Sequence, residues 1–310
     1  MRKLLVLPDC GENVPQLTEE FEVVTLSKND DTAKRLREIS DAEVIIGEPS
    51  LSELSEAHKL KWVQMTWAGA DRYLHGGFPT GVALTTASGA FGETIAEHAL
   101  AMLFSLCRRL PSYQKIAAWQ DLGCEKRIAG STALVFGCGD IGTEIARRLQ
   151  ALDVHTVGVC RSARQPRAYF EVLTTLSCAP AFLPEADIII CALPSNDETV
   201  HYFDEAQLSL CKDDAVLINV GRGSLIDLNA LTVCLTSGKF FGVGLDVTEP
   251  EPLPQDHPLR NMSNVILTPH VAGVSFGHLP ETEKKIWDIC RENLNRYIAK
   301  QPLRNAVSLP

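Results

Sequence analysis

The sequence predicts an α/β protein of two domains, each built around a parallel sheet. Short apolar segments alternate with polar segments of helix length along most of the 310 residues, as strands and covering helices do in parallel sheets. The length also suits two domains better than one. We expect one domain at 1–96 plus 273–310, interrupted by a second domain at 97–272.

The first domain is expected to contain five short strands. They are predicted at 3–7, 22–26, 43–47, 61–65 and 82–86. A helix from about Ala90 to Leu110, ending before Pro111, is apolar on nearly all sides and should be buried. The tail at 281–300 has one apolar face, which predicts an amphipathic helix that we assign to the first domain.

The second domain repeats the alternation with strands that are apolar throughout, as strands buried on both faces should be. They are predicted at 131–136, 154–159, 187–193, 215–220, 240–247 and 264–269. Residues 137–142 read GCGDIG between the first of these strands and a predicted helix at 143–152. Strand, glycine turn and helix form the context in which G-x-G-x-x-G indicates a dinucleotide site.

Each part of this turn has a physical role. Gly137 permits the turn, Gly139 lets the backbone approach a pyrophosphate, and Gly142 lets the helix pack close to the strand. The amides at the helix start, around Asp140 and Ile141, offer hydrogen bonds and a positive dipole end to the anion.

Composition excludes several classes of function. The formal charge is −10, from 29 basic and 39 acidic residues, which argues against nucleic-acid or anionic-membrane partners. Residues 1–7 lack a signal-peptide core, and 99–107 is too short to cross a membrane. Ten cysteines without a C-x-x-C pair or a histidine cluster indicate small buried residues in a reducing cytoplasm, with no metal site.

Three later segments place a chemically competent residue just after a predicted strand, where open α/β sheets bind ligands. They are NVGRGSLID (219–227) with Arg222, GLDVTEPEPLP (244–254) with Asp246, Glu249 and Glu251, and LTPHVAG (267–273) with His270. Arg222 could instead be a surface arginine in a turn, and the acidic residues of 244–254 could simply form a solvated loop. For Glu249 we favour the solvated loop. A lone histidine is more often structural, but none of the seven other histidines has a setting comparable to that of His270.

The order GCGDIG, NVGRGSLID, DVTEPEP, TPHVAG resembles the D-isomer-specific 2-hydroxyacid dehydrogenase family, in its glyoxylate/hydroxypyruvate reductase-like branch. The resemblance covers about 90–275 well; the N-terminal third matches mainly through WAGADR (67–72). It implies two Rossmann-like domains with parallel sheets, one flavodoxin-like and one dinucleotide-binding, with the active site in the cleft between them. Domain closure over that site is expected.

The resemblance also implies roles for single residues. Arg222 would bind the substrate carboxylate and polarise its ketone, His270 would be the general acid, and Glu251 would orient His270 and favour its protonated form. Asp246 would hold the nicotinamide carboxamide. The other expected substrate contacts are Trp67, Ala68, Gly69 and Ala70. The other expected cofactor contacts are Leu193, Pro194, Val220 and Gly221.

The cofactor preference follows from a missing acid. The residue that should grip the adenosine ribose, at the end of the strand after the glycine turn, is Cys160. Arg161, Ser162 and Arg164 follow it and can bind a 2′-phosphate, so we expect NADP(H) to be preferred, with NAD(H) possible. The alternative is that both arginines point to solvent.

Other interpretations stay open from sequence. A formate or phosphite dehydrogenase uses the same scaffold, and a dinucleotide-sensing binding protein would keep the fold without turnover. Trp67 either caps a small substrate pocket or packs in a core. The helix at 91–110 and the segment reaching Trp119 resemble the family's dimer-forming region, so a homodimer is expected.

Overall fold

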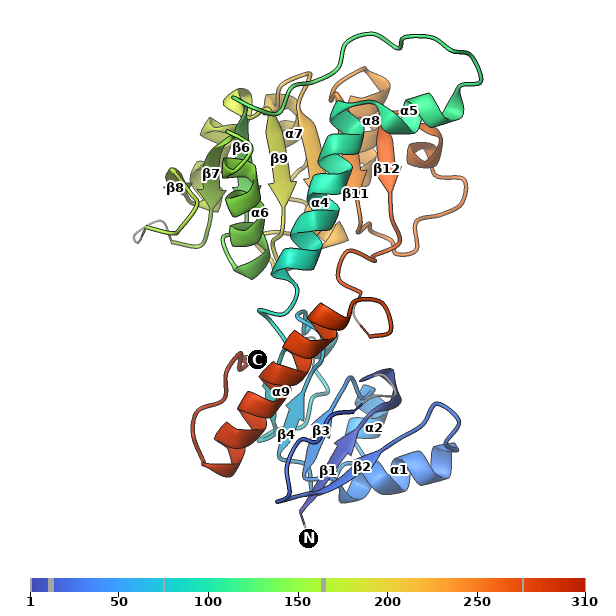
Figure 1. Cartoon of the computed structure of the whole chain (residues 1–310), viewed down its shortest axis with the longest axis vertical. Helices are drawn as coiled ribbons and strands as arrows, with labels where there is room; N and C mark the ends of the chain where they lie inside the picture. Colours follow the sequence, from blue (N-terminus) through green and yellow to red (C-terminus); the bar gives the residue numbers. More distant parts are fainter. Residues whose placement is uncertain (1, 11–13, 75, 163–165, 275, 310) are drawn as a thin grey trace. The chain divides into compact units, whose positions relative to one another are not determined.

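The structure is a computed structural model that describes residues 2–10, 14–74, 76–162, 166–274 and 276–309. The chain forms two compact units, Met1–Phe91 with Val274–Pro310, and Gly92–Gly273 (Figure 1). The second unit therefore interrupts the first. That the first unit binds substrate and the second binds dinucleotide stays a prediction, as do the boundaries 1–96 plus 273–310 and 97–272.

The smaller unit contains a five-stranded parallel sheet in the order β2-β1-β3-β4-β5. Its strands are β1 Lys3–Val6, β2 Glu22–Thr25, β3 Val44–Ile46, β4 Trp62–Gln64 and β5 Ala83–Thr85. All five predicted strands are confirmed. This order is that of a flavodoxin-like doubly wound sheet.

The helices of this unit include the C-terminal one. They are α1 Thr32–Asp41, α2 Leu51–Leu54, α3 Asp71–Leu74 and α9 Pro280–Ile298. Asn293 of α9 donates to Gln64 Oε1 at 2.8 Å, and Tyr297 stacks on Trp62 with ring centroids 5.2 Å apart. The predicted tail helix is therefore confirmed, and it packs in the unit to which the sequence assigned it.

The larger unit contains a seven-stranded parallel sheet in the order β12-β11-β10-β9-β6-β7-β8. Its strands are β6 Thr132–Phe136, β7 His155–Val159, β8 Val172–Thr174, β9 Ile188–Cys191, β10 Val216–Asn219, β11 Gly242–Leu245 and β12 Val265–Leu267. Six were predicted. The short β8 was missed because it is a partly exposed edge strand with little apolar patterning.

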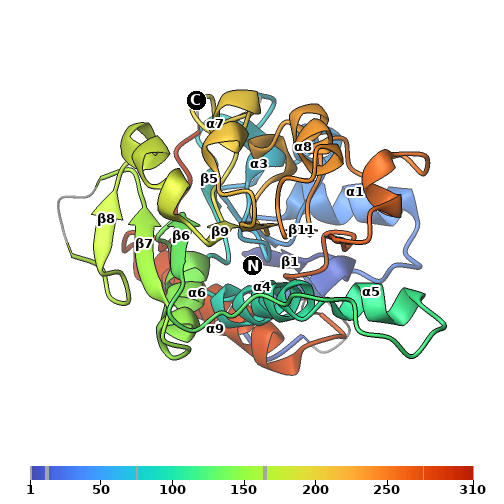
Figure 2. The same ribbon diagram turned by 90° about the horizontal axis from the view of Figure 1, so that it is seen from above.

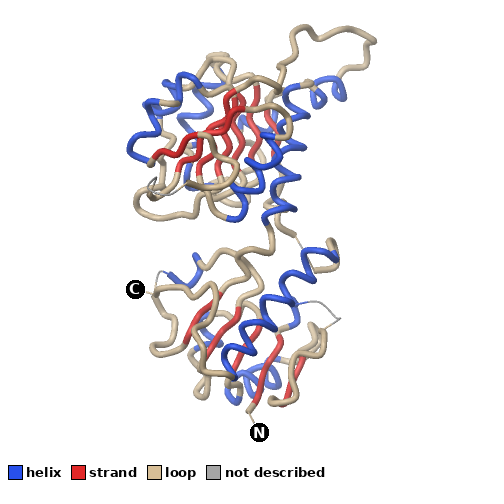
Figure 3. The backbone as a smooth tube through the Cα atoms, turned by 60° about the vertical axis from the view of Figure 1, so that its left-hand side comes forward, coloured by secondary structure: helices blue, strands red, loops and turns tan. Residues whose placement is uncertain are grey.

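Helices cover both faces of this sheet, which is why β9, β10 and β11 are buried along their whole length (Figures 2 and 3). Helices α4 and α6 pack together on one face, and α7 and α8 pack on the other. Their bounds, with those of α5, are α4 Gly92–Cys107, α5 Leu110–Lys115, α6 Asp140–Gln150, α7 Glu205–Leu210 and α8 Leu228–Thr236. Short 3-10 helices occur at η1 Pro8–Cys10, η2 Leu176–Ala181, η3 Leu183–Glu185, η4 Gly223–Leu225 and η5 Pro258–Asn261.

The long apolar helix differs from its prediction at its C-terminal end. It stops at Cys107, Arg109 adopts a left-handed conformation (φ 51°), and Pro111 lies in the first turn of α5. Proline is tolerated there because the first helical amides have no intrahelical partner. Burial is also incomplete, since Phe104 is 41% exposed.

The cysteines are all free. Cys124 and Cys178 are exposed, which corrects the expectation that all ten are buried. Within the described residues no group of three or more histidine, cysteine or acidic side chains is arranged to hold a metal ion. Among those same residues, no helix is both long and apolar enough to cross a membrane.

Candidate active site

Because all strands of the larger sheet run in parallel, the loops after them emerge at one edge. The glycine turn follows β6, Leu193 follows β9, and Arg222, Glu251 and His270 follow β10, β11 and β12. The sheet order therefore brings the predicted catalytic residues onto three adjacent loops. The glycine turn lies two strand positions away from the nearest of them, across β9.

The glycine turn is tightly packed at its first and third glycines. Gly137 has φ 102°, and a Cβ there would lie 2.7 Å from the carbonyl oxygen of Ala192. A Cβ on Gly142 would lie 1.7 Å from the carbonyl oxygen of Gly137. Gly139, in contrast, has an ordinary φ of −84°, and a Cβ there would meet no atom within 4 Å, so its surface is open.

This contrast predicts two different alanine variants. Gly142→Ala should lower the free energy of unfolding by about 1–3 kcal/mol, because the new methyl group forces the turn away from α6. Gly139→Ala should leave that free energy nearly unchanged but raise the Kd for dinucleotide, since its methyl group would cover the open surface. Urea unfolding and dinucleotide titration of both variants measure this; equal destabilisation by the two would contradict it.

The first turn of α6 fits a bound pyrophosphate. Gly139 is the N-cap residue and provides no side-chain hydrogen bond to the helix amides. Asp140 directs its carboxylate toward α4, where a Cβ on Gly92 would lie 2.6 Å from Asp140 Oδ1. The open side of the turn is therefore lined by backbone, which is the surface that an anion needs at a helix start.

The end of β7 lacks a carboxylate, as the sequence indicated. Cys160 is buried and its thiol donates to the Ser162 carbonyl oxygen at 3.1 Å, while Arg161 and Ser162 are exposed. Arg164 lies outside the described residues. Sequence analysis missed Arg167, whose Nη1 donates to the Cys138 carbonyl oxygen of the glycine turn at 2.8 Å.

The turn after β10 is held by a buried asparagine that sequence analysis did not select. Asn219 accepts from the Gly221 amide at 3.0 Å and donates to the Arg222 carbonyl oxygen at 2.8 Å. Arg222 is partly buried, and its Nη1 donates to the Gly221 carbonyl oxygen at 2.8 Å. Gly223 packs so closely that a Cβ there would lie 2.0 Å from the Thr248 carbonyl oxygen.

Asp246 organises the loop that carries the histidine. Its Oδ1 accepts from Thr268 Oγ1 at 2.6 Å and from the Val271 amide at 2.9 Å, and its Oδ2 accepts from the Ala272 amide at 3.0 Å. The His270 amide donates to the Asp246 carbonyl oxygen at 2.8 Å. These bonds hold His270 in a left-handed conformation with φ 55°, which a residue other than glycine adopts only when its surroundings demand it.

The predicted histidine–glutamate pair is present. His270 Nδ1 lies 3.0 Å from Glu251 Oε2, and Glu251 Oε1 accepts from the Thr248 amide at 3.4 Å. Both side chains are about half exposed. Since Nδ1 is engaged by the carboxylate, Nε2 is the nitrogen that can face a substrate. His98 of α4 also contacts the loop that carries His270, since His98 Nε2 lies 3.1 Å from Thr268 Oγ1.

A second histidine–glutamate pair lies in these loops. His201 Nε2 lies 3.0 Å from Glu249 Oε2, and both side chains are about half exposed, which agrees with the solvated loop favoured for Glu249. His201 also donates its amide to the Ser224 carbonyl oxygen at 2.7 Å. The pair therefore joins the loops after β9, β10 and β11.

In the smaller unit, the loop after β4 carries the predicted substrate contacts. The amides of Thr66 and Trp67 donate to Glu48 Oε1 at 2.7 and 3.1 Å. Within the described residues, the amides of Gly69 and Ala70 donate no hydrogen bond. Glu48 is 7% exposed, and burial raises the pKa of its carboxyl above the usual range, against the opposing effect of the Thr66 hydrogen bonds.

Trp67 is not a core residue, which removes one of the alternatives for it. Its side chain is 52% exposed, and the Arg72 guanidinium lies 5.7 Å from its ring centroid and 5.6 Å from that of Tyr73. The loop therefore exposes the Trp67 indole ring close in sequence to the Gly69 and Ala70 amides, which donate no hydrogen bond within the described residues.

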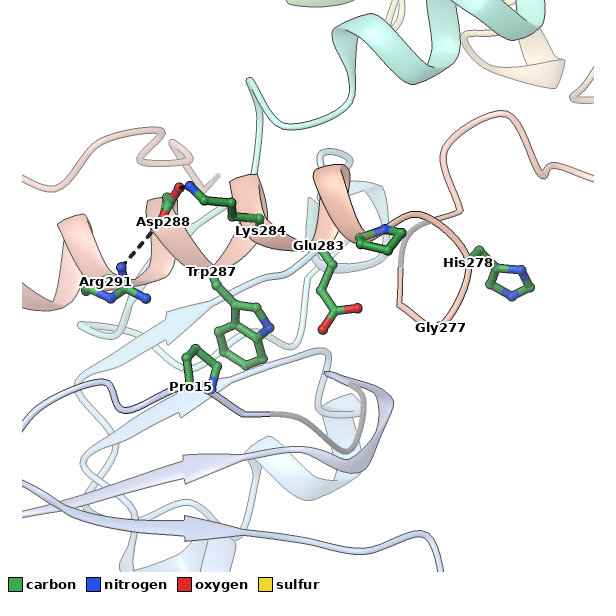
Figure 4. Close-up of a pocket in the computed structure, with 9 residues that line it drawn as sticks. Pro15, Gly277, His278, Glu283, Lys284, Trp287, Asp288 and Arg291 are labelled. Carbon is green, nitrogen blue, oxygen red and sulfur yellow. Dashed lines mark hydrogen bonds and ion pairs between the residues drawn. The ribbon is translucent and has the colours of Figure 1, made fainter.

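A separate depression in the smaller unit contains none of the predicted site residues (Figure 4). The indole of Trp287 lies in its wall between Pro15 and Glu283, and Trp287 Nε1 is buried without a hydrogen-bond partner among the described residues. Lys284 and Arg291, which also line it, each pair with Asp288.

Comparison with known proteins identifies the family. Residues 100–272 match the "D-isomer specific 2-hydroxyacid dehydrogenase, NAD binding domain". The chain belongs to this family. A D-isomer-specific 2-hydroxyacid dehydrogenase family protein from Aeromonas salmonicida has a solved structure that matches 99% of each chain with 32% identity and a TM-score of 0.86.

Named enzymes are among the relatives. A glyoxylate/hydroxypyruvate reductase of Arabidopsis thaliana is 32% identical, covering 74% of this chain and 70% of its own. A formate dehydrogenase of Pseudomonas is 30% identical, covering 82% of this chain and 67% of its own. This 2-hydroxyacid dehydrogenase family member is an NAD(P)-dependent oxidoreductase with a Rossmann-like dinucleotide-binding domain.

Proposed function

We propose that the protein reduces a small 2-oxo acid, of the glyoxylate or hydroxypyruvate type, to the D-2-hydroxy acid with NADPH. The observation that carries this proposal is the His270–Glu251 pair, 3.0 Å apart, on two of three consecutive loops of which Arg222 occupies the third. A proton donor with a carboxylate partner beside an arginine is what reduction of a ketone adjacent to a carboxylate requires.

Arg222, His270 and Glu251 have different roles in the proposed reaction. Arg222 binds the substrate carboxylate through its planar guanidinium and polarises the carbonyl oxygen. His270 holds a proton at Nε2 and delivers it to that oxygen as negative charge develops there. Glu251, bonded to Nδ1, keeps the ring oriented and stabilises the imidazolium.

The other end of the substrate carboxylate is assigned to the loop after β4. The amides of Gly69 and Ala70 are suited to it because they donate no hydrogen bond within the described part of the chain. Trp67 and Ala68 would line the space beside it, and the exposed indole favours a small substrate.

The dinucleotide would be held by the glycine turn and the neighbouring strand ends. The residues proposed are Gly137, Gly139, Asp140, Ile141, Gly142, Leu193, Pro194, Val220 and Gly221. Asp246 would also contact the carboxamide, since Oδ2 accepts only one hydrogen bond within the described residues and a carboxylate oxygen has room for two. When bound, the reduced nicotinamide supplies hydride to the carbonyl carbon.

The preference for NADPH rests on the end of β7, where Cys160 stands in place of an acid and Arg161 and Ser162 are exposed. Arg161→Asp should lower the ratio of kcat/KM for NADPH to that for NADH by about 10- to 100-fold, the loss of one charge-assisted hydrogen bond plus a new repulsion. Steady-state kinetics with both cofactors measure the ratio. A wild-type preference for NADH would contradict the assignment.

The first test is a spectrophotometric screen. NADPH oxidation is followed with glyoxylate, hydroxypyruvate, pyruvate and larger 2-oxo acids, and separately NADP⁺ and NAD⁺ reduction is followed with formate and phosphite. Turnover with a small 2-oxo acid supports the proposal. Turnover with formate alone would favour the activity named for the Pseudomonas relative. Dinucleotide binding without any turnover would favour a sensing role.

We also propose a cytoplasmic homodimer. Phe104, Leu110 and Trp119 are exposed apolar side chains on α4, on α5 and in the segment that follows. A second copy that covered these side chains would remove their apolar area from water, which favours association.

A further inference from the structure

We propose that Glu48 is the positioning residue of the substrate-carboxylate loop, defined as Thr66–Ala70. The inference rests on the proposed function, in which Gly69 and Ala70 of this loop bind the substrate carboxylate. Glu48 does not contact the substrate in this proposal. It acts by holding the first half of the loop so that the second half presents its amides.

The fold brings Glu48 to this place through two neighbouring strands. β3 and β4 are parallel, so the segments after them emerge at the same sheet edge. Gly47, with φ 125°, turns the chain after β3 and donates its amide to the Gln64 carbonyl oxygen at 2.9 Å. A Cβ on Gly47 would lie 2.7 Å from Leu7 Cβ, so this turn requires glycine and directs Glu48 toward the loop.

Among the residues that the structure describes, the Glu48 carboxylate accepts hydrogen bonds only from the start of the loop. Besides the Thr66 and Trp67 amides, the Thr66 hydroxyl lies 3.1 and 3.0 Å from Oε1 and Oε2. The Trp67 carbonyl oxygen in turn accepts from the Ala87 amide at 2.8 Å. Thr66 is thus held through its amide and hydroxyl, and Trp67 through its amide and carbonyl oxygen, whereas the amides of Gly69 and Ala70 donate no hydrogen bond within the described residues.

The chemistry of this contact is unlike ordinary packing. Glu48 is only 7% exposed yet forms no ion pair within the described residues, and Arg72 acts on it only at longer range. A buried carboxylate without a cation partner is destabilising unless hydrogen bonds compensate it. Its four contacts with Thr66 and Trp67 are that compensation, so removal of the carboxylate should release these two residues.

The test uses three variants. Glu48→Leu fills the space but accepts no hydrogen bond. Glu48→Gln can still accept from both amides with Oε1 and donate to the Thr66 hydroxyl, so it should restore the loop. Glu43→Leu is the matched control: Glu43 precedes β3 at the opposite end, and its carboxylate accepts from Arg2 and Tyr297, away from the loop.

We expect Glu48→Leu to raise the KM for the 2-oxo acid by about tenfold or more, with the KM for NADPH changed less than about twofold. Glu48→Gln should return the KM for the 2-oxo acid to within about threefold of wild type, and Glu43→Leu should leave both KM values unchanged. Should Glu48→Leu fail to fold, Thr66→Val removes the hydroxyl contacts alone and should raise the same KM about two- to fivefold. An unchanged KM for the 2-oxo acid in Glu48→Leu, or in Thr66→Val if the former does not fold, would overturn the inference.

Hydrogen exchange separates this inference from the function on which it rests. In the wild-type protein with NADPH, oxamate, a non-reducible analogue of a 2-oxo acid, should slow exchange of the amides at 69–70, and Glu48→Leu should remove that protection and speed exchange at 66–67. If oxamate protects the wild type and the Glu48→Leu variant equally, Glu48 has no positioning role although the loop binds carboxylate. If oxamate protects neither, the loop is not the carboxylate site and the inference falls with it.

Discussion

Replacement of His270 by alanine should lower kcat for reduction of a 2-oxo acid by about 10²–10⁴-fold, the usual contribution of a positioned proton donor. The KM for NADPH should change little, because the imidazole is assigned to the substrate oxygen. Removing the ring leaves Glu251 without its partner at Nδ1, so the variant loses both the donor and its orientation. Steady-state kinetics at saturating cofactor measure the effect.

The structure offers a matched control for this variant. His201→Ala removes a histidine that also pairs with a glutamate at 3.0 Å, and Glu249 belongs to the same loop as Glu251. It should lower kcat far less than His270→Ala, since His201 is proposed to join loops and not to donate a proton. Near wild-type turnover by His270→Ala, or equal losses in the two variants, would contradict the role of His270.

Arg222→Lys should lower kcat/KM for the 2-oxo acid by on the order of 10²-fold although the positive charge is kept. A lysine ammonium cannot engage carboxylate and carbonyl oxygens together through a planar pair of donors. The loss should appear mainly in the KM for the 2-oxo acid, with some loss in kcat from poorer polarisation of the carbonyl.

Arg260→Lys is the control for this substitution. Arg260 is another guanidinium of the larger unit, and it donates to the carbonyl oxygens of Leu253 and Pro254. Its replacement should affect the free energy of unfolding and leave kcat/KM close to wild type. A substrate role for Arg222 would be excluded by a kcat/KM of Arg222→Lys equal to that of the control.

Much of the fold could be predicted because the signals are local. Apolar runs bounded by turn residues predicted all five strands of the smaller sheet and six of the seven strands of the larger sheet. The spacing of Gly137, Gly139 and Gly142 assigned a distinct role to each. In the structure, a Cβ on Gly137 or Gly142 would collide with backbone atoms, whereas a Cβ on Gly139 would meet no atom within 4 Å. Prediction failed where a signal depends on surroundings, as at the exposed edge strand β8.

The residues of the candidate site fall into two groups, those that the sequence predicted and those that it did not. His270 and Glu251 were paired by resemblance, and the pairing is present at 3.0 Å. Supporting residues such as Asn219, His98 and Arg167 were not selected, because an isolated asparagine, histidine or arginine carries no pattern in a single sequence. Their importance arises from a partner brought close by the fold, as when Arg167 reaches the carbonyl oxygen of Cys138, 29 positions earlier.

The sequence by itself determined the class of the fold, because hydrophobic periodicity and glycine spacing are properties of neighbouring residues. The order of the four motifs in the chain carried the resemblance to the family. Only the tertiary structure decided which side chains meet. Glu48 and Thr66 are 18 positions apart and follow different strands, and their contact exists because β3 and β4 pair in one register. Glu249 likewise contacts His201 only because the loops after β11 and β9, on either side of β10, emerge at the same edge of the sheet.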